Sequence, residues 1–197
     1  MVDSMATSTS SSLVQRMIRA AKLEPHLYEE VEADQTATRE AAIVVAIVAV
    51  AGGIGSALHA SINQTGTNPL VALIFGVIWA LVGWVIWSYL TYFVGTRLFS
   101  GRATPGELLR TIGFAQAPGV LNILSFIPVL GGLIGLAAGI WVLVAGVVAV
   151  RQALDFDTGK AILTTIIGWL VLIAIPVILG LLGLGVIGGF AAVTQPG

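Results

Sequence analysis

The side chains that could do chemistry in this chain are few, and they gather in three short segments. Nine Lys and Arg residues and ten Asp and Glu residues lie within 3–40, 97–110 and 151–160. The remaining runs contain no charged residue: 41–96, 111–150 and 161–197. General acid–base catalysis, metal binding and ion-coupled transport all need ionisable groups in the right place, so these long apolar runs support none of them.

Nucleophilic and metal chemistry find equally little support. The chain has no cysteine, which excludes a disulfide framework, a thiol nucleophile and a Cys-type zinc site. Asp155 and Asp157 have the spacing that opens a calcium loop, but the later ligands of such a loop are missing. The net charge of −1 gives no indication of nucleic-acid binding. We therefore expect no enzyme activity, no cofactor, no metal and no nucleic-acid partner.

Three side chains within the apolar runs are candidates for specific polar contacts: Gln116, Asn122 and Trp141. Asn122 lies about 18 Å of helix rise beyond the nearest charge, which is close to the middle of a bilayer, and Gln116 is shallower. Such amides usually form hydrogen bonds between helices, and contact with a substrate or ion is the alternative. Trp141, like Trp87 and Trp169, lies too deep for an interfacial belt. We expect Asn122 or Gln116 to accept from one of these indoles.

The apolar runs predict membrane-spanning helices, because one span needs about 20 apolar residues. The run 41–96 divides at the polar linker HASINQTGTNP. The run 111–150 would be about 60 Å long as one helix, roughly twice the hydrocarbon core, so it must turn near IPVLGG. Five spans result, at roughly 41–60, 70–94, 110–127, 130–150 and 161–187. In the third span, Pro118-Gly119 predicts a kinked crossing helix, and a re-entrant segment buried in protein is the alternative.

The charges orient these spans. All nine Lys and Arg residues fall on one side of a five-span chain, and basic loops stay in the cytoplasm. The predicted fold class is therefore all-α, a polytopic membrane bundle of five transmembrane helices with a cytoplasmic N-terminus. Its predicted parts are a disordered tail, an amphipathic and acidic cytoplasmic segment, the transmembrane domain and a short external tail, at 1–12, 13–40, 41–190 and 191–197.

The segment 13–40 contains the candidate partner or surface contacts. Its first part predicts a basic amphipathic helix that begins after Ser12, with Arg16, Arg19 and Lys22 on the polar face. We expect this helix to lie on the membrane surface, and binding to a partner is the alternative.

Pro25 then predicts the start of a short acidic helix. Its small apolar face includes Leu27 and Tyr28. This face could dock on the basic helix, on the membrane domain or on another protein, and a solvated segment remains an alternative.

A second helix start is predicted further along the chain. Thr104-Pro105-Gly106-Glu107 has the spacing of a capping box with proline at the first helical position, so a helix should begin at residue 105.

Three stretches of the sequence resemble one known family: LYEEVEADQTATREA, GTRLFSGRATPGELLRTIGFAQAPGVL and VVAVRQALDFDTGKAI. They are similar to the Yip domain family, integral membrane proteins named for interaction with Ypt/Rab GTPases. The resemblance covers roughly residues 23–190 and fits best with the bacterial and archaeal branch. It implies five spans, a cytoplasmic N-terminus and a non-enzymatic protein, and for eukaryotic members a role in trafficking. The Asp-Leu-Tyr-Gly-Pro motif of those members is replaced here by HLYEE.

These observations favour a multi-pass protein of a prokaryotic plasma membrane that acts as a scaffold or adaptor. Its expected partners are the lipid bilayer and a cytoplasmic or membrane protein. The alternative is a small facilitator or lipid-handling channel that uses the kink at Pro118. A stripe of small residues, Gly131, Gly135 and Gly139, allows either internal packing or self-association into a homo-oligomer.

Overall fold

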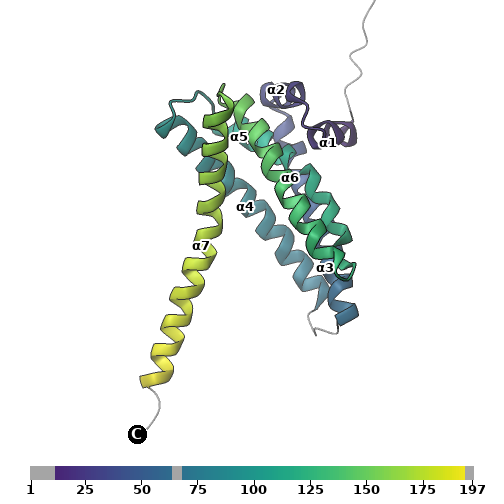
Figure 1. The fold of residues 1–197 in the computed structure, drawn as a ribbon, viewed down its shortest axis with the longest axis vertical. Coiled ribbons are helices and arrows are strands. Elements are labelled where there is room, and N and C mark those ends of the chain that lie inside the picture. The colour runs from purple at the N-terminus through teal and green to yellow at the C-terminus, as the bar shows by residue number, and fades with distance from the viewer. Residues whose placement is uncertain (1–11, 64–67, 194–197) are drawn as a thin grey trace, which may run out of the picture.

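The chain folds into a bundle of helices, seen in a computed structural model that describes residues 12–63 and 68–193 (Figure 1). This described part contains seven α-helices, one 3-10 helix and no strand, which confirms the predicted all-α class. The helices are α1 (Leu13–Ala21), α2 (Pro25–Ala33), α3 (Ala37–Asn63), α4 (Pro69–Leu98), α5 (Pro105–Ala115), the 3-10 helix η1 (Ala117–Phe126), α6 (Leu130–Ala153) and α7 (Thr158–Val193). The predicted tail at 1–12 lies outside the description except for Ser12, as do 64–67 of the linker and 194–197 of the predicted external tail.

Three helices of this described part are long and apolar enough to cross a membrane: Ala37–Ile62, Pro69–Leu98 and Leu130–Ala153. A shorter apolar helical stretch covers Thr158–Ala174, and α7 continues through Pro176 without a break. Large apolar side chains on these helices point outward, with Phe75 68% exposed and Leu70 65% exposed. Such exposed apolar surface suits contact with lipid rather than water. The count of five spans stays a prediction.

The segment between α5 and α6 changes helix type where Pro118 and Gly119 were expected to bend it. Helix α5 ends at Ala115, and ten residues of 3-10 helix follow. A 3-10 helix rises about 2.0 Å per residue against 1.5 Å in an α-helix, so α5 and η1 together run about 36 Å. The 24 residues of α6 also run about 36 Å. The two arms therefore match in length, which supports a crossing rather than a shallow re-entrant loop.

Close packing shields the backbone of η1, which lies against α3 and α6. Gly55 of α3 makes this approach possible. A Cβ added at Gly55 would lie 2.3 Å from the carbonyl oxygen of Asn122 and 2.5 Å from Oγ of Ser125. The carbonyl groups of Asn122 and Ile123 thus have protein, not lipid, against them, as membrane depth requires.

The predicted turn at Ile127–Gly132 and the predicted helix starts are confirmed. Val129 adopts a φ of 66° in the turn that leads into α6. Ser12 caps α1 in a capping box with Gln15. Thr104 caps α5 in the same way with Glu107, whose carboxylate accepts from the Thr104 amide at 2.8 Å.

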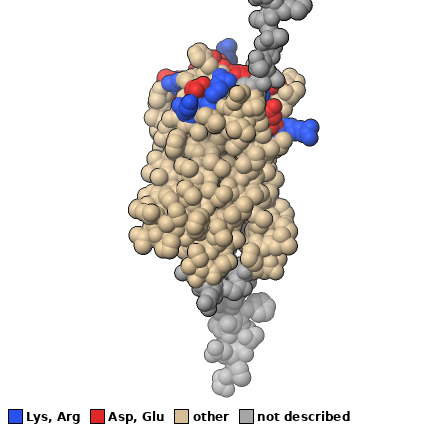
Figure 2. Space-filling model, turned by 90° about the vertical axis from the view of Figure 1, so that its right-hand side faces the viewer, with Lys and Arg blue, Asp and Glu red and all other residues tan. Residues whose placement is uncertain are grey.

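The three charged segments of the sequence meet at one end of the bundle. Helices α1 and α2, the connection between α4 and α5, and the connection between α6 and α7 all lie there (Figure 1). Figure 2 shows Lys, Arg, Asp and Glu gathered at this end of the visible face, above a body of uncharged residues. The charges thus divide the molecule into a polar end and an apolar body, as a membrane would require.

Single cysteines test this arrangement, because the chain itself has none. In sealed vesicles we expect Lys22→Cys, Arg102→Cys and Asp157→Cys to react with an impermeant maleimide from one side. Ser61→Cys, at the far end of α3, should react only from the other side. Labelling of Arg102→Cys and Ser61→Cys from the same side would contradict the shared charged end.

Candidate functional site

The candidate site is the cap, which we define as α1, α2 and the first turn of α3 at the charged end. Its centre is Arg16, whose side chain is only 11% exposed. The guanidinium contacts three carboxylates, those of Glu30 at 2.9 Å, Asp34 at 3.2 Å and Glu40 at 2.9 Å. These partners come from α2, from its C-cap and from α3, so one side chain joins three elements.

A tight connection brings the basic face of α1 onto the acidic face of α2. Leu23 turns the chain with a φ of 61°, and its amide donates to Ala20 O at 2.9 Å. Arg19 then pairs with Glu24 at 3.0 Å and with Glu30 at 2.7 Å. The basic residues predicted to face lipid headgroups are therefore largely paired inside the cap, and only Lys22 of the three is exposed.

Part of the apolar face of α1 points outward, while Leu13 and Met17 pack against the core. Val14 is 63% exposed and Ile18 is 49% exposed. An amphipathic helix with this arrangement fits the predicted position at a membrane surface, which stays a prediction.

Leu27 and Tyr28 were predicted as partner or surface contacts, and their burial contradicts this. Both are fully buried, as is Val31, because α2 packs this face on α5 and α6. The Tyr28 hydroxyl donates to Ala20 O at 3.1 Å, and burial raises its pKa well above the ordinary value. The two residues are part of the internal core that docks the cap on the bundle.

Arg110 is the residue that sequence reasoning missed, since it served there only as a span boundary. It is 7% exposed, and its Nε donates to Val31 O at 2.9 Å and to Glu32 O at 3.1 Å. One terminal nitrogen also donates to Glu32 O. A cation at these last carbonyls of α2 is favoured by the helix dipole. The signal in the sequence is weak, namely a charge between the apolar residues Leu109 and Ile112.

Among the carboxyl groups of the cap, that of Glu32 has the most strongly shifted pKa. Burial, followed by the negative charges of Glu107 and Asp155, raises its pKa from the ordinary 4.5 to about 7. The positive charge of Arg110 opposes this shift, and the negative charge of Glu29 adds to it. The carboxyl group therefore changes its charge near neutral pH while the carbonyl of the same residue is held by Arg110.

The indole of Trp141 finds a different partner from the one predicted. Its Nε1 donates to Ala21 O at 2.8 Å, and no hydrogen bond joins an indole to Asn122 or Gln116 within the described residues. The reason is that α1 packs against α6 and η1, so the free carbonyl at its C-terminus reaches the indole first. Trp84, which the sequence did not single out, likewise donates to a backbone oxygen, that of Leu109 at 2.9 Å.

The two amides of the apolar runs lie apart from this cap. Gln116 is the C-cap residue of α5, and its side chain lines an apolar cavity. Asn122 lies close to α6, since its Oδ1 would be 3.7 Å from a Cβ added at Gly135. Among the described residues neither side chain makes a hydrogen bond, and no group of three potential metal ligands occurs there.

Removal of the Arg16 side chain should loosen the cap. Arg16→Ala leaves Asp34 and Glu40 without this cation, so we expect the free energy of unfolding to fall by about 2 kcal/mol. Denaturation of the purified protein in mild detergent measures the loss. The matched control is Lys22→Ala, at an exposed position, which should change stability by no more than about 0.5 kcal/mol. Equal losses in both variants would refute the central role of Arg16.

The raised pKa of Glu32 predicts a pH dependence of stability. Between about pH 4.5 and pH 7 the unfolded chain loses this proton while the folded chain keeps it. The contribution of Glu32 to stability should therefore be greatest at low pH and should decline as pH rises through this window. Unfolding curves of wild type and Glu32→Gln across pH 4–8 measure it, and the two should differ in slope within the window. Parallel curves would contradict the shift.

Comparison with known proteins gives one match. The family model of the Yip1 domain matches residues 27–191 of this chain. No curated protein and no solved structure matches.

Proposed function

The chain belongs to the Yip1 domain family, and from this premise we propose that it acts as a non-enzymatic scaffold or adaptor in the membrane. The family consists generally of non-enzymatic membrane proteins, and the apolar helices agree with an integral membrane protein in contact with the lipid bilayer. In this proposal the bundle anchors the chain in a prokaryotic plasma membrane, and the cap meets a cytoplasmic or membrane protein or a second copy of the chain.

One observation supports this proposal above the others, namely that contacts within the chain itself hold the cap in place. Arg16 joins α1, α2 and α3, while Arg110 and Trp141 join the cap to α5 and α6. A surface ordered in advance loses less conformational entropy on binding than a tail that must fold on its partner. A scaffold benefits from such a surface.

The outward groups of the cap give the surface its chemistry. His26 has a side chain that is 89% exposed and pairs with Glu29, which is 55% exposed, at 3.2 Å. Glu29 also accepts from Gln152 at 2.7 Å. The exposed Lys22 and Glu29 give the cap both signs of charge, together with hydrogen-bonding groups, so a polar protein surface suits it better than a single-sign polyanion does.

Deletion of 13–40 would not test this function cleanly. The deletion would remove Leu27, Tyr28 and Val31 from the core and leave Arg110 without the carbonyls that it holds. Loss of function would then follow from loss of the fold.

A photo-crosslinking amino acid at His26 gives the sharper test. In native membranes we expect one discrete protein adduct, and we expect the adduct to decrease several-fold when Arg16→Ala loosens the cap. The control is the same probe at Ile78, which is 53% exposed on the apolar body and should capture lipid only. Capture of lipid alone at His26, or the same adduct from both positions, would count against the scaffold.

A further inference from the structure

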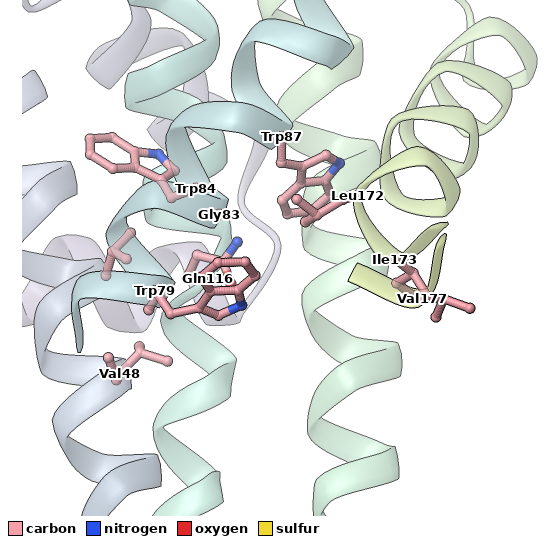
Figure 3. Close-up of a pocket in the computed structure, with 12 residues that line it drawn as sticks. Val48, Trp79, Gly83, Trp84, Trp87, Gln116, Leu172, Ile173 and Val177 are labelled. Atoms are coloured by element: carbon pink, nitrogen blue, oxygen red, sulfur yellow. The ribbon is translucent and has the colours of Figure 1, made fainter. Parts of the chain in front are cut away.

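A cavity of about 430 Å³ lies between α3, α4 and α7. Figure 3 shows the side chains that line it, mainly aliphatic and aromatic groups from these three helices. The volume falls within the range of small-molecule sites, roughly 300–1,000 Å³. None of its lining residues is charged.

Two kinds of polar group belong to the lining, namely the indoles of three tryptophans and one amide. Trp87 is 3% exposed, and its Nε1 has no hydrogen-bond partner among the described residues. Gln116 supplies the amide, which makes no hydrogen bond in the described part of the chain. The Nε1 of Trp87 is itself buried against Gly168 of α7, so the primary amide of Gln116 is the group that favours a ligand with a hydrogen-bond acceptor.

The cavity is accessible from the side of the bundle. Three lining residues also lie on its outer surface: Trp79 is 63% exposed, Val177 54% and Ile173 41%. Helices α4 and α7 diverge with distance from the charged end (Figure 1). A molecule would therefore enter laterally from the bilayer, where lipid is the abundant solvent, rather than from water.

The depth and the charge of the site select among lipids. Gln116 follows Arg110 by about 9 Å of helix rise, so it lies a short distance below the charged end. A free fatty acid would bring a carboxylate to a lining that contains no cation, which is unfavourable in a low dielectric. An uncharged ester carbonyl carries no such cost.

We propose that this cavity binds one acyl chain of a membrane diacyl phospholipid, with an ester carbonyl oxygen that accepts a hydrogen bond from the Gln116 amide. The chain fills the apolar space between α3, α4 and α7. The bound lipid joins α7 to the rest of the bundle. This inference goes beyond the scaffold function, because no step of that function uses the cavity.

Gly83 offers a way to block the site. It lines the cavity, and a Cβ added there would meet no atom within 4 Å. Gly83→Leu therefore fills the cavity without a clash at the point of attachment. Gly139→Leu is the matched control, since Gly139 lies on the exposed side of α6 with nothing within 4 Å of an added Cβ.

The experiment uses the full chain in vesicles of phosphatidylcholine that carries a photoactivatable group on one acyl chain. We expect label at Trp87 and Gln116 in wild type and in Gly139→Leu. In Gly83→Leu we expect the label at these two residues to fall several-fold, while label at the outward Phe75 is unchanged. Absence of label at Trp87 and Gln116 in wild type, or equal label in Gly83→Leu, would mean that only surrounding lipid is present and would overturn the proposal.

Two further measurements keep the test decisive. Preferential labelling by a photoactivatable free fatty acid, without competition from unlabelled phosphatidylcholine, would overturn the assignment to a diacyl lipid. If Gly83→Leu does not fold, Gln116→Leu replaces it, since leucine keeps much of the volume and removes the amide. Native mass spectrometry should then show phospholipid retained by wild type and lost several-fold from Gln116→Leu, and equal retention would refute the proposed hydrogen bond.

Discussion

The last carbonyl groups of a helix have no partner within that helix, and the position of the cap depends on how these groups are satisfied. At the end of α1, Tyr28 donates to Ala20 O and Trp141 donates to Ala21 O. At the end of α2, Arg110 donates to Val31 O and Glu32 O. Three long side chains from other helices thus join the two short helices to one another and to the bundle.

These contacts also explain why the charged end is ordered. Short helices of nine residues such as α1 and α2 are marginal alone in water. The ion pairs of Arg16 fix their mutual orientation, and the fully buried Leu27 and Val31 supply apolar contact with the bundle. Each of these interactions contributes modestly to stability, and together they fold a segment rich in charge into an ordered surface.

The sequence predicted the local features well because their causes are local. The caps at Ser12 and Thr104, the change of helix type just before Pro118 and the turn at Pro128 all follow from residues within one turn of the event. Convergence of the charges at one end also follows from a simple alternation of charged and apolar runs.

The partners of the polar side chains could not be predicted in the same way. Every residue has a backbone carbonyl, so the residue types alone do not show which carbonyl a side chain will bind. Nothing in the sequence therefore indicated that Trp141 would donate to Ala21 O or that Arg110 would donate to Glu32 O. The apolar face of α2 had several possible docking surfaces, and only the tertiary arrangement decides between them. The paired state of Arg16 was hidden for the same reason, since a basic face looks alike whether it meets lipid headgroups or carboxylates.

The separation of these contacts along the chain has a consequence for biogenesis. Arg110 reaches Val31 across 79 residues, and Trp141 reaches Ala21 across 120. When the ribosome has synthesised α1 to α4, it has not yet synthesised Arg110 and Trp141, the side chains that hold α1 and α2 in place. Such non-local closure is slow and comes late. The finished surface therefore exists only on chains that already include α6, and shorter products do not display it.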